Sequence, residues 1–283
     1  MLNWVGNKQK YFSIIELFVK DFQTVVDPMM GSGNVLIQLS SKHNIIGCDI
    51  VKLLPIIYQK INCFDISLKM MNSIIKTNND FKNKNDYYNF RDHWNEKYIN
   101  DIFDDKFLIE TFLLLKMCSN SMVRFNKKGY FNQGFRGTNN EGFFYKSNLR
   151  KFIDQLKFIK YNLSLNKNLF LVMDVIDFLE NYDFEKEHIF IFDPPYLLTD
   201  GFYSQEYNFE KEQKLFNFIN NSGIKFLLFN FIERNEIMHD NLKDFIKANN
   251  FNISFLNDKS MTGQNRKGKS EVKEVLITNL KGL

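Results

Sequence analysis

Residues 188–196 of the chain read HIFIFDPPY, a largely apolar run that ends in a carboxylate, two prolines and a tyrosine. A short apolar run bounded by turn residues is typical of a strand that is buried on both faces of a sheet. The two prolines have no N–H group and a fixed φ, so the backbone after the strand offers only carbonyl acceptors in one geometry. A purely structural turn would explain the prolines but not the Asp and Tyr that flank them. We therefore predict an acceptor site for an amine, formed by Asp193, Pro194 and Tyr196.

Three further apolar runs each precede an aspartate: residues 24–26 before Asp27, 44–48 before Asp49 and 169–173 before Asp174. Helical patterns lie between them, and more strand patterns follow toward the C-terminal end. We predict helices at 10–22, 35–41 and 148–162, a strand at 225–229, and a hairpin of 251–256 with 274–279. This alternation predicts an α/β fold with a mainly parallel sheet covered by helices on both faces.

The alternation stops between residues 51 and 150, where polar helical patterns at 86–101 and 106–120 precede a Gly- and Asn-rich loop at 126–142. We therefore predict a catalytic domain of residues 1–52 and 151–283, interrupted by an inserted domain of residues 53–150. The net charge of +4 does not by itself indicate a nucleic-acid partner. The stretch from 124 to 151 is more informative, because basic and aromatic side chains alternate there with Glu141 as the only acid. Such a stretch can hold a phosphate backbone, although a solvated surface loop is the alternative.

Composition excludes several other classes of protein. The three cysteines, Cys48, Cys63 and Cys118, lack the CxxC spacing of a zinc site or a disulfide framework. The four histidines are scattered, and Lys8 lies in no GxxxxGK[ST] motif, which argues against a hydrolytic triad and a P-loop NTPase. From the cysteines we expect a reducing cytoplasm and no metal, and from the lack of a long uncharged apolar run we expect a soluble protein with no membrane partner.

The turn after the first strand, residues 27–33, reads DPMMGSG. Gly31 and Gly33 can bring this backbone close to a bound ligand. Asp49, at the end of the next strand, is placed to accept hydrogen bonds from both hydroxyls of a ribose, as in nucleotide-binding α/β folds. An aspartate that only caps the following helix is the alternative.

The acceptor site suits the exocyclic N6 amine of adenine, whose lone pair is delocalised into the ring. Acceptors at Asp193 and at the Pro194 carbonyl would draw both amino hydrogens out of the plane and localise that lone pair for attack. Tyr196 would stack on the base, which must first leave the duplex stack.

The order of these motifs resembles the Dam-type DNA N6-adenine methyltransferases, the alpha group of the D12 class. In that family a GxG motif precedes a target-recognition insert and then DPPY. Residues 3–8, NWVGNK, resemble the family's N-terminal Trp-x-Gly-Gly-Lys segment, with Asn7 in place of the second glycine. Residues 124–132, RFNKKGYFN, resemble its recognition hairpin, and residues 265–267 and 274–279 resemble its C-terminal strand.

The resemblance implies a Rossmann-like sheet that binds S-adenosylmethionine, with a mostly helical recognition domain carrying a β-hairpin. The methyl donor is already activated, so the enzyme needs proximity and alignment rather than a metal. Asp49 would bind the cofactor ribose, Asp174 would approach the cofactor adenine, and Asp193 would touch both cofactor and target amine. The residues implied for the cofactor are Trp4, Lys8, Asp27, Pro28, Gly31, Gly33, Asp49, Asp174 and Asp193.

Double-stranded DNA is the implied partner, with Arg124, Asn126, Lys127, Asn132 and Arg136 as the contacting residues. A monomer is expected, and a restriction endonuclease encoded nearby is a candidate second partner. Relatives that methylate GATC use the arginine of this hairpin to contact a guanine. Recognition of GATC by this chain is a hypothesis only, because residues 133–137, QGFRG, depart from the family pattern. Restriction protection, repair marking and phage defence stay open.

Two alternatives remain at this stage. An RNA adenine methyltransferase would use the same acceptor chemistry, whereas the large basic insert favours duplex DNA. A DNA-binding paralogue without catalysis would be expected to lose affinity for S-adenosylmethionine. Enzymes acting on cytosine N4 or on protein glutamine more often carry Ser or Asn in place of Asp193.

Overall fold

A computed structural model describes residues 7–64, 72, 76, 83–136, 146–185, 187–198, 207–256 and 272–281. Trp4, Glu141 and residues 265–267 lie outside this part of the chain. Contacts divide the chain into two compact units. Unit 1 contains Met1–Lys10, Gly31–Lys42 and Val51–Phe170, and unit 2 contains Tyr11–Met30, His43–Ile50 and Leu171–Leu283.

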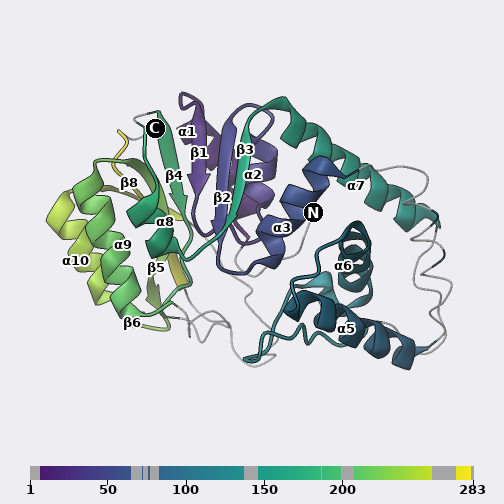
Figure 1. The fold of residues 1–283 in the computed structure, drawn as a ribbon. Helices are drawn as coiled ribbons and strands as arrows, with labels where there is room; N and C mark the ends of the chain where they lie inside the picture. Colours follow the sequence, from purple (N-terminus) through teal and green to yellow (C-terminus); the bar gives the residue numbers. More distant parts are fainter. Residues whose placement is uncertain are drawn as a thin grey trace. The chain divides into compact units, whose positions relative to one another are not determined.

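The central sheet has the strand order β3-β2-β1-β4-β5-β8-β7, with β6 paired to β5 (Figure 1). The strands are β1 (Thr24–Asp27), β2 (Asn44–Asp49), β3 (Asn168–Val172), β4 (His188–Phe192), β5 (Lys225–Arg234), β6 (Ile237–Met238), β7 (Asn252–Leu256) and β8 (Val272–Thr278). Strand β1 pairs in parallel with β2 and β4, and β4 pairs in parallel with β5. Strand β8 is antiparallel to both β5 and β7. The α/β class is thus confirmed, with a mixed rather than mainly parallel sheet because the closing hairpin joins it.

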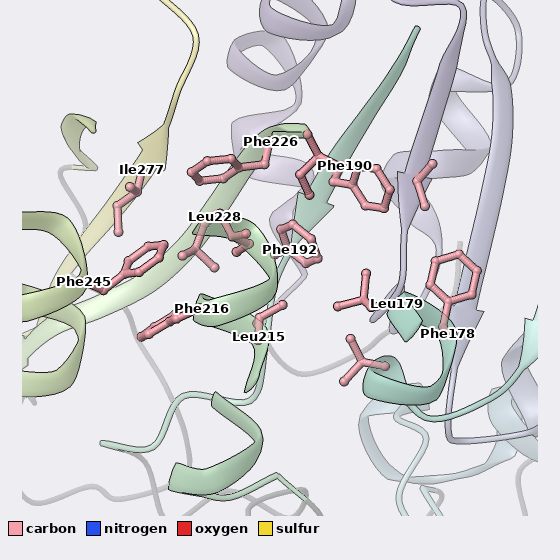
Figure 2. Packing of buried hydrophobic residues seen from close by; sticks show 14 of the residues in the cluster. Phe178, Leu179, Phe190, Phe192, Leu215, Phe216, Phe226, Leu228, Phe245 and Ile277 are labelled. Atoms are coloured by element: carbon pink, nitrogen blue, oxygen red, sulfur yellow. The ribbon is translucent and has the colours of Figure 1, made fainter. Parts of the chain in front are cut away.

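One face of the sheet packs on three helices of unit 2, α8 (Val175–Asn181), α9 (Phe209–Ser222) and α10 (Asp240–Asn249). Figure 2 shows the contact, in which side chains of the strands meet those of the helices: Phe190, Phe192, Phe226, Leu228 and Ile277 with Phe178, Leu179, Leu215, Phe216 and Phe245. Burying each such side chain contributes about 1.5–3 kcal/mol, which makes this layer the core of unit 2. Gly223, at φ 68°, ends α9 in the left-handed region that favours glycine.

The opposite face carries Tyr11, which directly precedes α1 (Phe12–Val19). Its ring stacks on Phe229 of β5, with centroids 5.8 Å apart and planes 13° from parallel. Successive strand residues point to opposite faces, so Phe229 faces away from Leu228 and the helical core. Both faces of this part of the sheet are therefore covered.

Unit 1 contains the helices α2 (Asn34–Leu39), α3 (Leu53–Cys63), α5 (Lys84–Ile99), α6 (Asp105–Met117) and α7 (Lys146–Leu165), with the short 3₁₀ helices η1 (Lys8–Tyr11), which extends into unit 2, and η2 (Ser119–Ser121). Asn83 begins α5 with a capping box, in which its side chain and that of Asp86 cap each other's backbone N–H groups. The predicted helix 106–120 ends earlier, at Met117, because Cys118 adopts an extended backbone.

Aromatic rings hold α5 and α6 together. Trp94 stacks on Tyr98 and Phe107 at centroid distances of 5.1 Å each, and its indole N–H donates to Thr111 at 2.8 Å. Among the helices that the structure describes, none combines the length and hydropathy that crossing a bilayer requires.

Candidate active site

The chain turns sharply after β1. The Asp27 carboxylate accepts a hydrogen bond from the Met29 N–H at 3.1 Å, and the Met30 N–H donates to the Cys48 carbonyl at 2.9 Å. Gly31 and Gly33 follow with φ of 50° and 66°, the left-handed region where a side chain is strained. A Cβ on Gly33 would also lie 2.7 Å from Cε2 of Tyr58. The glycines are therefore required by the turn itself.

Asp49 is the last residue of β2, and Asp174 follows the neighbouring strand β3. The Met173 N–H donates to the Asp49 carbonyl at 3.3 Å, which holds the two chain segments together. Asp174 is the N-cap of α8 and accepts a hydrogen bond from the Ile176 N–H at 2.9 Å. Its other carboxylate oxygen pairs with the Lys211 Nζ at 2.6 Å. Lys211 was not foreseen from the sequence.

The carboxylates of Asp27, Asp49 and Asp174 all act electrostatically on the buried thiol of Cys48. Burial, followed by the charge of Asp49, raises the pKa of Cys48 to about 12, with further contributions from Asp27 and Asp174. The hydrogen bond that the thiol donates to the Met173 carbonyl at 3.2 Å opposes this rise. Three of the predicted aspartates thus gather at the carboxyl ends of β1, β2 and β3.

The Asp193-Pro194-Pro195-Tyr196 turn follows β4, which is parallel to β1, so it begins at the same edge of the sheet as Asp27. Pro194 is buried and Asp193 and Tyr196 are half-buried. The Tyr196 hydroxyl donates to Oε1 of Glu274 at 3.0 Å, and its ring packs on Phe231 at 4.2 Å between centroids. Burial, and then the charges of Asp193 and Glu274, raise the pKa of Tyr196 well above its usual range. The phenol therefore stays protonated.

Three more residues were predicted to bind the cofactor, namely Lys8, Pro28 and Trp4. Lys8 lies in η1 and is buried, with 6% of its surface exposed. Pro28 lies within the turn after β1. Trp4 falls outside the described residues.

Residues 124–136 of unit 1 form a short antiparallel hairpin, referred to below as the 124–136 hairpin. Phe125 bridges Phe131, and Cys118 bridges Phe135 at its base. The Asn132 N–H donates to the Arg124 carbonyl at 3.1 Å. Asn126, Lys127, Asn132 and Arg136 are exposed, whereas Arg124 is half-buried.

Asn126 has a structural role in this hairpin. Its side-chain oxygen accepts hydrogen bonds from the Lys128 and Tyr130 N–H groups at 2.9 and 3.1 Å. Gly129, at φ 77°, completes the turn. The side-chain oxygen of Asn126 is thus engaged by the turn, and contact of Asn126 with DNA stays a prediction.

Two residues of α5 that the sequence did not single out hold the hairpin. Asn95 is buried and pairs with both backbone groups of Phe131, accepting from its N–H at 2.8 Å and donating to its carbonyl at 3.1 Å. The Tyr87 hydroxyl donates to the Gln133 carbonyl at 2.8 Å. In the sequence, this role is indicated only by the position of an Asn and a Tyr on the buried face of an otherwise polar helix.

The family of D12 class N6 adenine-specific DNA methyltransferases matches residues 4–262. The chain belongs to this family. This D12-class chain also resembles curated relatives. Modification methylase StsI of Streptococcus sanguinis is 30% identical over 98% of this chain and 42% of that protein. Modification methylase LlaI of Lactococcus lactis subsp. lactis is 24% identical over 98% of this chain and 43% of that protein.

A third relative is closer in length to this chain. Type II methyltransferase M.MjaIII of Methanocaldococcus jannaschii is 28% identical over 81% of this chain and 83% of that protein. The D12-class chain therefore spans less than half the length of StsI and LlaI, and most of the length of M.MjaIII.

Proposed function

We propose that the chain is a site-specific, adenine-specific DNA methyltransferase that transfers a methyl group from S-adenosylmethionine to the N6 amine of adenine in duplex DNA. The observation that carries the proposal is the rigid Asp193-Pro194-Pro195-Tyr196 turn at the sheet edge where β1 ends in Asp27, in a chain of the D12 class. An acceptor-only backbone beside a carboxylate and an aromatic ring suits an aromatic amine.

The carboxylates around Cys48 fit the donors of S-adenosylmethionine. A ribose presents two hydroxyl donors, for which Asp49 is the proposed acceptor, and the adenine amine is proposed for Asp174. Asp27, Pro28, Gly31 and Gly33 would form the turn beside the cofactor, and Trp4, Lys8 and Asp193 would complete its pocket. When bound, the cofactor supplies a methyl group that the sulfonium has already activated.

The target adenine must leave the base stack to reach this site. Flipping costs a few kcal/mol, and stacking on Tyr196 would return about 1–3 kcal/mol of it. Asp193 and the Pro194 carbonyl would each accept one amino hydrogen, which localises the nitrogen lone pair. Nucleophilic attack then needs mainly alignment, because Asp193 would fix the amine at the edge proposed for the cofactor pocket. As the N–CH3 bond forms, the S–CH3 bond would break to leave a neutral thioether, and the amine would release one proton, for which the Asp193 carboxylate or solvent is the acceptor.

We assign DNA recognition to an inserted domain of residues 53–150, with Arg124, Asn126, Lys127, Asn132 and Arg136 as its contacts. The hairpin's exposed basic side chains and its rigid aromatic base support this division. Recognition of GATC, with Arg124 on a guanine, is the specific hypothesis. The relatives named modification methylases suggest a cognate restriction endonuclease as partner, and we propose that the methyltransferase acts as a monomer.

The test is transfer of labelled methyl from S-adenosylmethionine to unmethylated duplex DNA and, separately, to RNA. Mass spectrometry of the hydrolysed nucleosides identifies the product. N6-methyldeoxyadenosine would support the proposal. Label in RNA alone would contradict it and make the chain an RNA methyltransferase.

A further inference from the structure

Glu274 is a buried carboxylate in the C-terminal strand β8, with 3% of its surface exposed. It lies opposite Phe231 of β5 in the antiparallel register. A buried carboxylate is stable only where hydrogen bonds replace its hydration. Two phenols supply such bonds here, because the Tyr11 hydroxyl donates to Oε2 at 2.6 Å and the Tyr196 hydroxyl donates to Oε1 at 3.0 Å.

The rings of both tyrosines are also fixed by the neighbouring strand. Tyr196 packs on Phe231 at 4.2 Å between centroids, with the planes 54° apart. Tyr11 stacks on Phe229, two residues earlier in β5 and on the same face. Each tyrosine is thus held by its hydroxyl and by its ring, and the two share one carboxylate.

We propose that Glu274 is a positioning residue that holds the Tyr196 ring as a preformed platform for the flipped adenine, with Tyr11 holding Glu274 in turn. This role presupposes the adenine methylation proposed above. A side chain fixed before binding loses less rotamer entropy when the base stacks on it.

The electrostatics agree with this geometry. Burial, with the charges of Asp193 and Glu274, raises the pKa of Tyr196. The phenol therefore stays protonated and able to donate, rather than becoming a second anion beside Asp193.

The experiment begins with the wild-type chain, unmethylated plasmid DNA and labelled S-adenosylmethionine. Once the methylated adenine is mapped, 2-aminopurine replaces it in a synthetic duplex and reports base flipping by fluorescence. Glu274→Gln removes the negative charge at nearly constant shape. Glu233→Gln is the matched control, since this carboxylate lies in β5 and pairs with the exposed Lys273 at 2.7 Å.

Glu274→Gln should lower kcat/KM for DNA about tenfold, the effect of weakening one charge-assisted hydrogen bond. The 2-aminopurine signal should fall with it, whereas S-adenosylmethionine affinity by calorimetry should stay within about twofold of wild type. Glu233→Gln should change none of these. Equal loss of cofactor affinity and of flipping would overturn the positioning role.

A second variant separates positioning from general packing. In a Tyr196→Phe background the ring remains but its hydroxyl is absent, so Glu274→Gln should have little further effect on flipping. An undiminished effect there would overturn the role. Should Glu274→Gln fail to fold, Tyr196→Phe alone should reduce the flipping signal, and a wild-type signal would overturn it equally.

The two proposals fail in different ways. A wild-type chain that methylates no DNA overturns the proposed function, and this role falls with it. A wild-type chain that methylates DNA, with a Glu274→Gln variant of equal activity and equal flipping, overturns the positioning role alone.

Discussion

The sheet edge in unit 2 and the 124–136 hairpin in unit 1 hold their functional side chains in different ways. At the sheet edge, Asp27 and Asp49 are buried, and strand ends and a proline turn set the positions of the polar groups. In the hairpin, most polar side chains are exposed on a turn that aromatic rings and Asn95 support from below. The difference is that main-chain geometry positions the polar groups at the sheet edge, whereas the hairpin presents side chains on a supported turn; under the proposed function, the first would carry the chemistry and the second the recognition of DNA sequence.

The largest effect is expected at the sheet edge. Asp193→Ala removes the carboxylate acceptor of the target amine and should lower methyl transfer by on the order of 10³-fold. Labelled-methyl transfer at saturating DNA measures this. The exposed Asp177 of α8 gives the control, since Asp177→Asn should retain activity. Normal turnover of Asp193→Ala would contradict the assignment.

Tyr196→Ala should weaken base capture more than cofactor binding. Losing a stacking platform costs about 1–3 kcal/mol, so kcat/KM for DNA should fall roughly 5- to 150-fold. Calorimetry should show unchanged affinity for S-adenosylmethionine. A fall in both affinities of equal size would mean that the ring supports the fold rather than the base.

Arg124 and Lys127 should separate sequence reading from phosphate binding. Arg124→Ala should cost about 1–3 kcal/mol at one base position and relax discrimination there. Lys127→Ala should weaken binding evenly across sequences and lower the salt slope by about 0.9. Binding assays on a panel of duplexes at several salt concentrations measure both, and identical behaviour of the two variants would contradict this division.

Asn95 tests whether the hairpin needs its rigid base. Asn95→Ala leaves both backbone groups of Phe131 without their buried partner, which should lower the free energy of unfolding by about 1–3 kcal/mol. Urea denaturation measures this, with the exposed Asn85→Ala on the same helix as control. We expect weaker sequence discrimination in Asn95→Ala with intact cofactor binding.

The smallest effect concerns the Cys48 thiol. The pKa of Cys48 is raised from 9.0 to about 12 in the folded protein. Between these two pH values the thiol stays protonated in the folded protein but ionises in the unfolded chain. Its contribution to stability is therefore complete below pH 9 and is lost as pH rises toward 12. At pH 8, iodoacetamide should modify the exposed Cys63 and leave Cys48 unmodified, as peptide mass spectrometry would show. Rapid alkylation of Cys48 would contradict the buried geometry.

The sequence predicted the elements whose pattern is local. Strand β4 occupies residues 188–192 as expected, because a short, continuous apolar run that ends at a proline turn is typical of a buried strand. Helices α3, α9 and α10 were not predicted, although their buried apolar residues recur at helical spacing, such as Leu242, Phe245 and Ile246 of α10. Strand β5 extends to Arg234, beyond the predicted residue 229, because β8 pairs with it along that length.

Contacts between residues that are distant in sequence could not be predicted, because no local pattern joins them. Tyr11 and Glu274 are 263 positions apart, and no local pattern joins a tyrosine before the first helix to a glutamate in the last strand. The Asp174–Lys211 pair depends equally on how α8 and α9 pack. For Asn126, the sequence predicted a DNA contact, which stays a prediction, and only the hydrogen bonds to Lys128 and Tyr130 show that it also forms the turn.

The most direct test maps methylated adenines in the DNA of a host without adenine methylation that expresses the wild-type chain, Asp193→Ala or Arg124→Ala. Single-molecule sequencing reads every modified position. We predict one short motif for the wild type, none for Asp193→Ala, and the same motif with one relaxed position for Arg124→Ala. Methylation by Asp193→Ala, or an unchanged motif in Arg124→Ala, would contradict the division between chemistry at the sheet edge and sequence reading by the hairpin.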